Sequence, residues 1–340
     1  MLNTLRRGRR ALLALCLGLV ASFGAQATYS NVYFFGDSLS DTGNLYTASG
    51  GIEPPPPYYN GRFSNGPLWV ETVASGLGFA SAANPFLLGG NNYAFAGAFT
   101  GTGGLADPLL GGTPTGLQTQ VAGYWSTSHV TADSNALYVV EIGSNDLLGI
   151  ASTFSGVSPA DYAARLAGAQ LAISNLLFSL NFLIDRGARN FLIANAPNLG
   201  VIPLAGAFQL AATDASIQYN NLLVGALAAL GGNPNIVEFD LFDLITGIVA
   251  DAQAGGQTYG MTNGTIPCII DLSTCDDSVF FDPQHPTAQV HALAGQAALA
   301  LVPEPRSSLL LVATALLLAV IAIRRRTVPT RRPTLAPLGT

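Results

Sequence analysis

Short apolar runs of strand length alternate along this chain with longer segments of helical character. The helical segment at residues 161–186 is the clearest, because Ser158 suits the N-cap, Pro159 suits the first helical position and Gly187 suits the end. Strands that alternate with helices predict βαβ units and a parallel sheet, here within one domain at residues 28–302. The expected strands are residues 32–35, 136–142, 190–194 and 236–239, and the other expected helices are residues 67–77, 213–230 and 286–300.

The first 27 residues have the composition of a secretory signal peptide. Four arginines precede an apolar run from residue 11 to residue 23, and Ala25-Gln26-Ala27 follows. A basic region, an apolar core and an A-x-A site in this order are typical of an exported protein that signal peptidase cuts. The apolar core is short for a membrane span, so a retained anchor is kept only as the alternative.

A second module follows the predicted domain at residues 303–326. It consists of Pro303-Glu304-Pro305, an apolar run at residues 309–323 and three arginines at residues 324–326. These parts, in this order, resemble the PEP-CTERM sorting signal of Gram-negative bacteria. The resemblance implies a transmembrane segment before processing, cleavage by an exosortase-type protease and delivery to the cell surface or extracellular matrix. An ordinary C-terminal anchor is the alternative, and a short tail at residues 327–340 follows the arginines.

Positive charge is concentrated in these two terminal modules. The chain has no lysine, and residues 28–302 contain four arginines against 19 carboxylates, a formal charge of −15. A surface of this charge repels nucleic acid and other anionic polymers. We therefore exclude nucleic acid as a partner and expect either neutral or cationic substrates or a charge that serves solubility alone.

Cys268 and Cys275 are the two cysteines of the predicted domain. They are seven positions apart in a stretch rich in Gly, Thr and Asp. In an exported protein this spacing predicts a local disulfide, which would hold the loop ahead of His285. A metal site is disfavoured, because no further His or Cys lies near them at ligand spacing.

The sequence Gly36-Asp37-Ser38 directly follows the first predicted strand. Gly and Asp there predict a tight turn, which places Ser38 at the carboxyl end of a strand, where open α/β sheets bind ligands. Near the other end of the domain, Asp282 precedes His285 by three residues. A serine hydroxyl needs a base to become a nucleophile, and the base needs an acid that fixes its tautomer. We therefore expect a Ser38-His285-Asp282 triad; the alternative for Asp282 is the N-cap of the following helix.

An acyl-transfer site also needs hydrogen-bond donors for the oxyanion that develops during the reaction. Asn145 follows the second predicted strand and offers a side-chain amide, while Gly97 offers a backbone N–H that a ligand can approach closely. Taken alone, each of these residues also suits a turn or a tightly packed position. Asp37 is expected to shape the serine turn, and Asn44 and Asp146 to support the loops that carry the nucleophile or the amide.

Four sequence blocks in order resemble those of the SGNH hydrolases, also called the GDSL lipase/esterase family. The matching residues are Ser38 in the nucleophile block, Gly97 and Asn145 in the two oxyanion blocks, and Asp282 and His285 in the last block. The resemblance implies a flavodoxin-like α/β/α sandwich around a parallel five-stranded sheet. It also implies an oxyanion hole formed by Ser38, Gly97 and Asn145, and catalysis without a metal or organic cofactor. Residues 60–71 resemble the lipase-like branch, and Ala96 stands where many relatives have a second glycine.

Together these features predict an exported serine ester hydrolase that cleaves carboxylic esters through an acyl-enzyme. Its substrate is left open between acyl lipids, small esters and acetylated glycans. One alternative is a deacetylase of a surface polysaccharide, which would reject long acyl chains. The other is a non-catalytic matrix or adhesion protein that keeps the fold. The loops at residues 50–59 and 87–116 are expected to shape the pocket.

Overall fold

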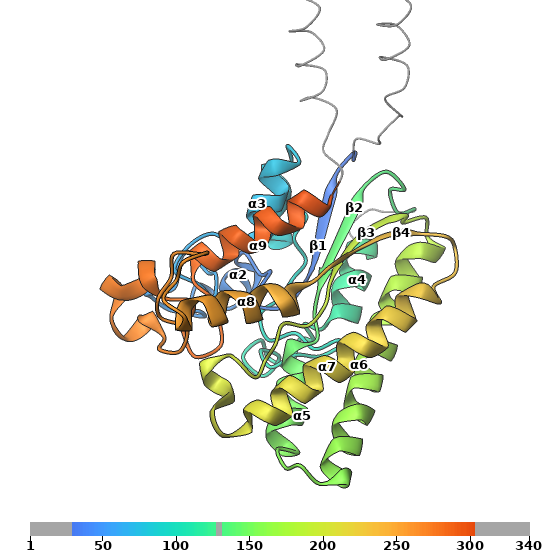
Figure 1. Ribbon diagram of the computed structural model, residues 1–340. Helices are drawn as coiled ribbons and strands as arrows, with labels where there is room; N and C mark the ends of the chain where they lie inside the picture. The colour runs from blue at the N-terminus through green and yellow to red at the C-terminus, as the bar shows by residue number, and fades with distance from the viewer. Residues whose placement is uncertain (1–28, 127–130, 303–340) are drawn as a thin grey trace, which may run out of the picture. The chain divides into compact units, whose positions relative to one another are not determined.

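The structure, a computed structural model, describes residues 29–126 and 131–302. Its sheet has four parallel strands in chain order, each within one residue of a predicted strand at either end (Figure 1). They are β1 (Val32–Gly36), β2 (Leu137–Glu141), β3 (Asn190–Ala194) and β4 (Asn235–Phe239). Because all four run the same way, their carboxyl ends share one edge of the sheet. The predicted modules at residues 1–27 and 303–326, and the tail, lie outside the described residues.

A fifth segment extends the sheet beyond β1. Phe34 and Gly36 exchange three backbone hydrogen bonds of 2.7 to 3.1 Å with residues 91–95, and the bridge between Phe34 and Asn92 is parallel. With this short segment the spatial order becomes residues 91–95, β1, β2, β3, β4, which is the order of a flavodoxin-like sheet. The point where the order reverses lies beside β1, and ligands bind at such points in open α/β sheets.

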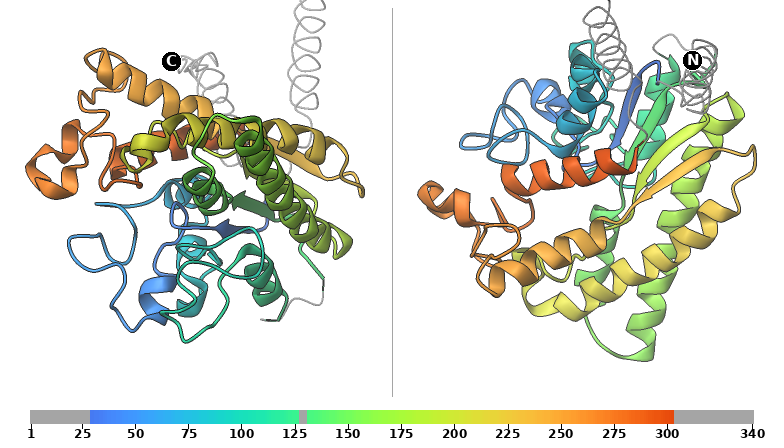
Figure 2. Two further views of the ribbon diagram at one scale, coloured as in Figure 1. Left: turned by 90° about the horizontal axis from the view of Figure 1, so that it is seen from below. Right: turned by 45° about the horizontal axis from the view of Figure 1, so that its top comes forward.

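Helices cover both faces of the sheet and complete three layers (Figures 1 and 2), as expected for an α/β/α sandwich. One layer contains α3 (Trp69–Gly76), α8 (Leu241–Gln253) and α9 (Ala288–Leu301); the other contains α4 (Leu117–Ser126), α5 (Ser144–Thr153), α6 (Pro159–Asp185) and α7 (Gln209–Ala228). A short helix, α2 (Asn44–Ala48), follows the β1 turn. Every residue of β1 and β2 is buried, because helices cover both faces of a parallel sheet.

The long helix α6 begins and ends where the sequence predicts. The Ser158 side chain accepts a hydrogen bond from Asp161 N at 3.1 Å, and the chain leaves the helix through Gly187 at φ 113°. By length and composition alone, α6 is the one candidate membrane span among the described residues. It packs along α7, and 44% of its most apolar window is buried within the fold, including Leu176, Leu180 and Leu183.

Candidate active site

Ser38 lies in a tight turn at the carboxyl end of β1. The turn closes on Asp37, whose backbone oxygen accepts the N–H of Ser40 at 3.0 Å and whose carboxylate accepts the N–H of Leu39 at 3.1 Å. Asp37 thus shapes the turn through hydrogen bonds. Gly36 is needed before it, because a Cβ at this position would collide with the backbone of the neighbouring strand β2.

His285 reaches Ser38 from the far end of the domain, 247 residues later in the sequence. Its Nε2 lies 2.8 Å from Ser38 Oγ, and its Nδ1 lies 2.6 Å from Asp282 Oδ2. Asp282 Oδ1 accepts the backbone N–H groups of Gln284 and His285, each at 2.7 Å. The N-cap of the following helix α9 is Thr287, so Asp282 does not serve as that cap.

The Asp282 carboxyl is held in its ionised form. Burial acts to raise its pKa, but the hydrogen bond and charge of His285, followed by the hydrogen bond of Tyr58, hold the pKa below its usual value. An ionised acceptor at this distance fixes the imidazole tautomer with its proton on Nδ1, which leaves Nε2 free to accept a proton from Ser38.

Tyr58 is a site residue that the sequence did not reveal. Its hydroxyl donates to Asp282 Oδ2 at 2.6 Å, the same oxygen that faces His285. The Tyr58 ring packs against Phe63 and Phe281, with ring centroids 5.4 and 5.1 Å away. The loop after the prolines at residues 54–57 therefore contributes a second hydrogen bond to Oδ2 of the acid, beside that of His285.

Asn145 and Gly97 lie together with Ser38 along one groove. The Asn145 amide nitrogen donates to Ala98 O at 3.0 Å and to Asp37 Oδ2 at 3.3 Å. Gly97 has φ 79°, in the left-handed region that favours glycine, and its carbonyl accepts Leu105 N at 2.8 Å. The structure thus brings both expected oxyanion residues to the serine turn, with the amide of Asn145 positioned by two acceptors.

The side chains of Asn44 and Asp146 form hydrogen bonds with the backbone of residues 92–100. The Asn44 amide donates to two carbonyls within residues 92–94 at 2.7 and 2.8 Å. Asp146 accepts Thr100 N at 2.9 Å and Thr100 Oγ1 at 2.8 Å. Asn44 thus ties the loop after Ser38, and Asp146 ties the helix that carries Asn145, to the stretch around Gly97.

A second carboxyl, that of Glu141, lies behind the serine turn. It is 1% exposed, accepts the Ser40 hydroxyl at 3.3 Å and is hydrogen-bonded to Asp37. Burial, and then the charge of Asp37, raises the pKa of Glu141 well above its usual value, and burial raises that of Asp37 to about 6. Of the two carboxyls, Glu141 is therefore the one that binds the proton more tightly, and it is the donor in their shared hydrogen bond. Glu141 was not predicted from the sequence, although a carboxylate at the end of an otherwise apolar strand is a feature that could have revealed it.

The protonated state of Glu141 predicts a pH dependence of stability. A carboxyl whose pKa is raised by folding binds its proton more tightly in the folded protein, so the free energy of unfolding falls as pH rises above the ordinary value of about 4.3. Glu141→Gln keeps the donated hydrogen bond and removes this titration. We expect the melting temperature of the variant minus that of the wild type to increase from pH 4 to pH 8 in thermal unfolding. Glu238→Gln, at an exposed position, is the matched control; an equal increase there would contradict the assignment.

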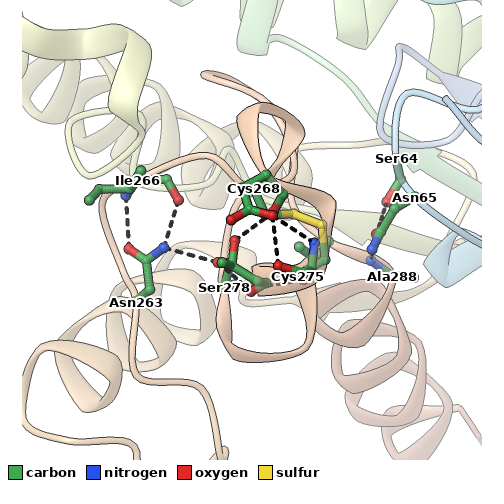
Figure 3. Close-up of a disulfide and its surroundings, with 12 residues drawn as sticks. Ser64, Asn65, Asn263, Ile266, Cys268, Cys275, Ser278 and Ala288 are labelled. Atoms are coloured by element: carbon green, nitrogen blue, oxygen red, sulfur yellow. Dashed lines mark hydrogen bonds between the residues drawn. A yellow bond between two sulfur atoms is a disulfide. The ribbon is translucent and has the colours of Figure 1, made fainter. Parts of the chain in front are cut away.

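The predicted disulfide between Cys268 and Cys275 is formed and stabilises the chain ahead of Asp282 (Figure 3). Cys268 N donates to Phe280 O at 3.0 Å, and Phe281 packs against both cysteines. The cross-link therefore ties down the residues directly before the Asp282–His285 pair. Within the described ranges, no three His, Cys, Asp or Glu side chains gather as metal ligands.

Two spaces meet at Ser38, Gln284 and His285. The first, here called the apolar cavity, lies between the carboxyl edge of the sheet and helices α3, α8 and α9, and offers about 40 Å³ to the centres of water-sized groups. The second, here called the open groove, runs over Gly97 and Asn145. It offers about 260 Å³ to the centres of water-sized groups. The side chains that line the apolar cavity include Trp69, Leu199, Ile202, Leu241, Ile245, Val290 and Ala294.

The fold thus brings a hydrogen-bonded serine, histidine and aspartate to the carboxyl edge of a flavodoxin-like parallel sheet. The sequence matches the family model described as GDSL-like Lipase/Acylhydrolase over residues 32–298. The chain therefore belongs to the GDSL lipase/acylhydrolase family and is a carboxylic ester hydrolase.

Curated relatives come from bacteria and plants. The chain is 29% identical to a phosphatidylcholine-sterol acyltransferase of Aeromonas hydrophila, over 71% of this chain and 68% of that protein. It is 28% identical to a GDSL esterase/lipase of Arabidopsis thaliana, over 81% of this chain and 88% of that protein. A member of the lipolytic protein G-D-S-L family from Veillonella parvula aligns in structure with a TM-score of 0.40 and 14% identity, over 79% of this chain and 96% of that one.

Proposed function

We propose that Ser38, His285 and Asp282 are the catalytic triad of this ester hydrolase. The observation that carries the proposal is the continuous hydrogen-bonded line from Ser38 Oγ through His285 to Asp282, with distances of 2.8 and 2.6 Å. Family membership supports an enzyme over the alternative of a non-catalytic matrix or adhesion protein.

The reaction proceeds in two halves. His285 Nε2 takes the proton of Ser38 as its oxygen attacks the ester carbonyl, and Asp282 stabilises the imidazolium that forms. The tetrahedral intermediate then collapses, the bond to the alcohol breaks, and the alcohol leaves with the proton from His285. Water, which the same histidine deprotonates, attacks the acyl-serine, and collapse of the second intermediate releases the carboxylic acid and returns the proton to Ser38.

We assign the oxyanion to the backbone N–H groups of Ser38 and Gly97 and the side-chain amide of Asn145. Of the two acceptors that Asn145 now faces, Asp37 is the more distant, at 3.3 Å against 3.0 Å for Ala98. The oxyanion would replace Asp37 as acceptor for one amide proton. The bond to Ala98 would keep the amide oriented, as preorganised stabilisation of the transition state requires.

Substitution of the amide tests this assignment. We expect Asn145→Ala to lower kcat about 10²- to 10³-fold, the usual cost of one lost oxyanion donor. Turnover of p-nitrophenyl esters would be measured with the full chain, with Ser152→Ala, an exposed position on the same helix α5, as the control. Wild-type turnover by Asn145→Ala would remove Asn145 from the oxyanion hole.

We further propose that residues 1–27 direct export and that residues 303–326 act as a PEP-CTERM-type sorting signal. During export the chain would be cut by signal peptidase, and during sorting it would be cut by an exosortase-type protease. Its destination would be the cell surface or extracellular matrix of a Gram-negative bacterium. The Cys268–Cys275 disulfide supports an oxidising compartment. Mass spectrometry of the protein isolated from such a host would find Thr28 as the first residue and a C-terminus near residue 303; intact termini would contradict both proposals.

A further inference from the structure

We propose that the apolar cavity is the acyl-binding site and that it selects esters of short acids, from acetyl to about pentanoyl. The inference rests on the proposed triad and names the substrate class that the triad serves. Acyl lipids with long chains are thereby disfavoured as substrates, while small esters and acetylated glycans fit.

The direction of the acyl group follows from the placement of the oxyanion donors. Gly97 and Asn145 line the open groove but not the apolar cavity, so the oxyanion of the intermediate lies on the groove side of Ser38. The leaving oxygen must face His285 Nε2, which donates its proton. The remaining carbon substituent of the tetrahedral centre, the acyl chain, then points away from the oxyanion donors and into the apolar cavity. The groove, wider and open to solvent, is left for the alcohol.

The size of the cavity sets the chain length. The space open to the centres of water-sized groups is about 40 Å³ in the apolar cavity, against about 260 Å³ in the open groove. A space this small holds only a few groups of the size of a water or a methylene, so the cavity takes a short chain of a few carbons beyond the carbonyl carbon. The walls around it are fixed, since Ile202, Leu241 and Ile245 are at most 5% exposed and belong to the packed core. A longer chain would have to displace core side chains, which is costly in a close-packed interior.

Two polar atoms in the cavity wall also disfavour a long hydrocarbon chain. Ser144 Oγ and His291 Nε2 are buried, and within the described residues neither has a hydrogen-bond partner. Burial, and then the charge of His285, lowers the pKa of His291 to about 3, so this side chain is neutral. A long alkyl chain that filled the cavity would offer these atoms no hydrogen bond and would leave them unpaired.

The chain-length profile of the full protein tests the proposal. We would measure kcat/KM on p-nitrophenyl esters from acetate to palmitate, with Ser38→Ala as the background. The expected profile peaks between acetate and pentanoate and falls at least 10-fold by octanoate, because one misplaced methylene in a fitted pocket changes the rate by about 10-fold or more. A Ser38-dependent peak at octanoate or longer would overturn the acyl assignment and leave the triad standing. Absence of Ser38-dependent turnover on every ester would overturn the triad, and the acyl assignment with it.

Variants of the cavity wall separate selection by size from general effects on folding. Ile245→Ala removes three side-chain carbons and enlarges the cavity, so it should move the peak to chains up to about three carbons longer. Ile248→Ala, the same truncation on the same helix α8, does not line the cavity and is fully buried; it should lower stability without moving the peak. If Ile245→Ala does not fold, Ala294→Leu fills the cavity instead and should reduce kcat/KM for butyrate at least 10-fold more than for acetate. An unchanged ratio in a folded variant would overturn the proposal.

Discussion

Ser38→Ala is expected to lower kcat by a factor of about 10⁶, the cost seen when the nucleophile of a serine triad is removed. Without Ser38 Oγ no acyl-enzyme forms, and His285 is left 2.8 Å from a position that holds no hydroxyl. The measurement is hydrolysis of p-nitrophenyl butyrate by the full chain, together with labelling by an active-serine fluorophosphonate. We expect one labelled site in the wild type and none in Ser38→Ala.

Ser75→Ala is the matched control for this experiment. Ser75 lies exposed on α3, outside the residues that line the apolar cavity and the open groove, so its loss should change neither turnover nor labelling. Circular dichroism would establish that both variants are folded. If Ser38→Ala kept turnover within 10-fold of the wild type, another residue would have to be the nucleophile.

Asp282→Asn is expected to lower kcat about 10⁴-fold with the fold intact. The carboxylate accepts at one oxygen from both His285 Nδ1 and Tyr58 Oη, each at 2.6 Å, and at the other from two backbone N–H groups. An amide cannot accept on both sides, so it must turn a donor toward either the histidine or the backbone. The imidazole then loses the partner that fixes its tautomer, and the developing imidazolium loses its counter-charge. Burst and steady-state kinetics on p-nitrophenyl esters would measure the loss in each half-reaction.

Tyr58→Phe is the matched variant for Asp282→Asn. It removes one of the two hydrogen bonds to Asp282 Oδ2 but keeps the carboxylate and the ring packing against Phe63 and Phe281. A hydrogen bond to a charged group contributes about 1.5 to 3 kcal/mol, so we expect a loss of roughly 10- to 100-fold, well below that of Asp282→Asn. Equal losses in the two variants would mean that the tyrosine, rather than the acid, orients His285.

The strands were predictable from sequence, whereas the helices α2, α4, α5 and α8 were not. The four apolar runs are short and bounded by polar or glycine residues, a pattern that fits a buried parallel strand. The helices α5 and α8 begin within three residues of the ends of β2 and β4, and each is short. At the β4–α8 junction only Asp240 interrupts the apolar residues, so periodicity alone does not separate strand from helix there. At the β2–α5 junction the residues 143–146 are Gly, Ser, Asn and Asp, which suit a turn as well as the first turn of a helix. The start of α8 is set by a local hydrogen bond: the N-cap residue Asp240 accepts Asp243 N at its Oδ1, at 3.0 Å.

The residues of the candidate site also fall into two groups, those that the sequence predicts and those that only the structure reveals. Spacing and residue type sufficed to propose Ser38, Asp282 and His285, because a nucleophile, a base and an acid are chemically distinctive. Tyr58 contacts Asp282 across 224 residues, and this contact depends on the path of the loop that follows the prolines. Loop paths of this kind depend on tertiary packing, which one sequence does not determine. The size of the apolar cavity has the same origin, since six separate stretches of the chain form its walls, at residues 37–39, 69, 144, 197–202, 241–245 and 280–294.

The distance along the chain between Ser38 and His285 has a consequence for biosynthesis. Ser38 follows the first strand of the domain, and His285 precedes its last helix, so a ribosome must translate nearly the whole domain before both exist in one chain. A nascent or prematurely terminated product that ends at α8 holds the serine and both oxyanion residues but has neither base nor acid. Such products are expected to be inert toward esters of the cell that makes them, so that the timing of translation itself delays the activity.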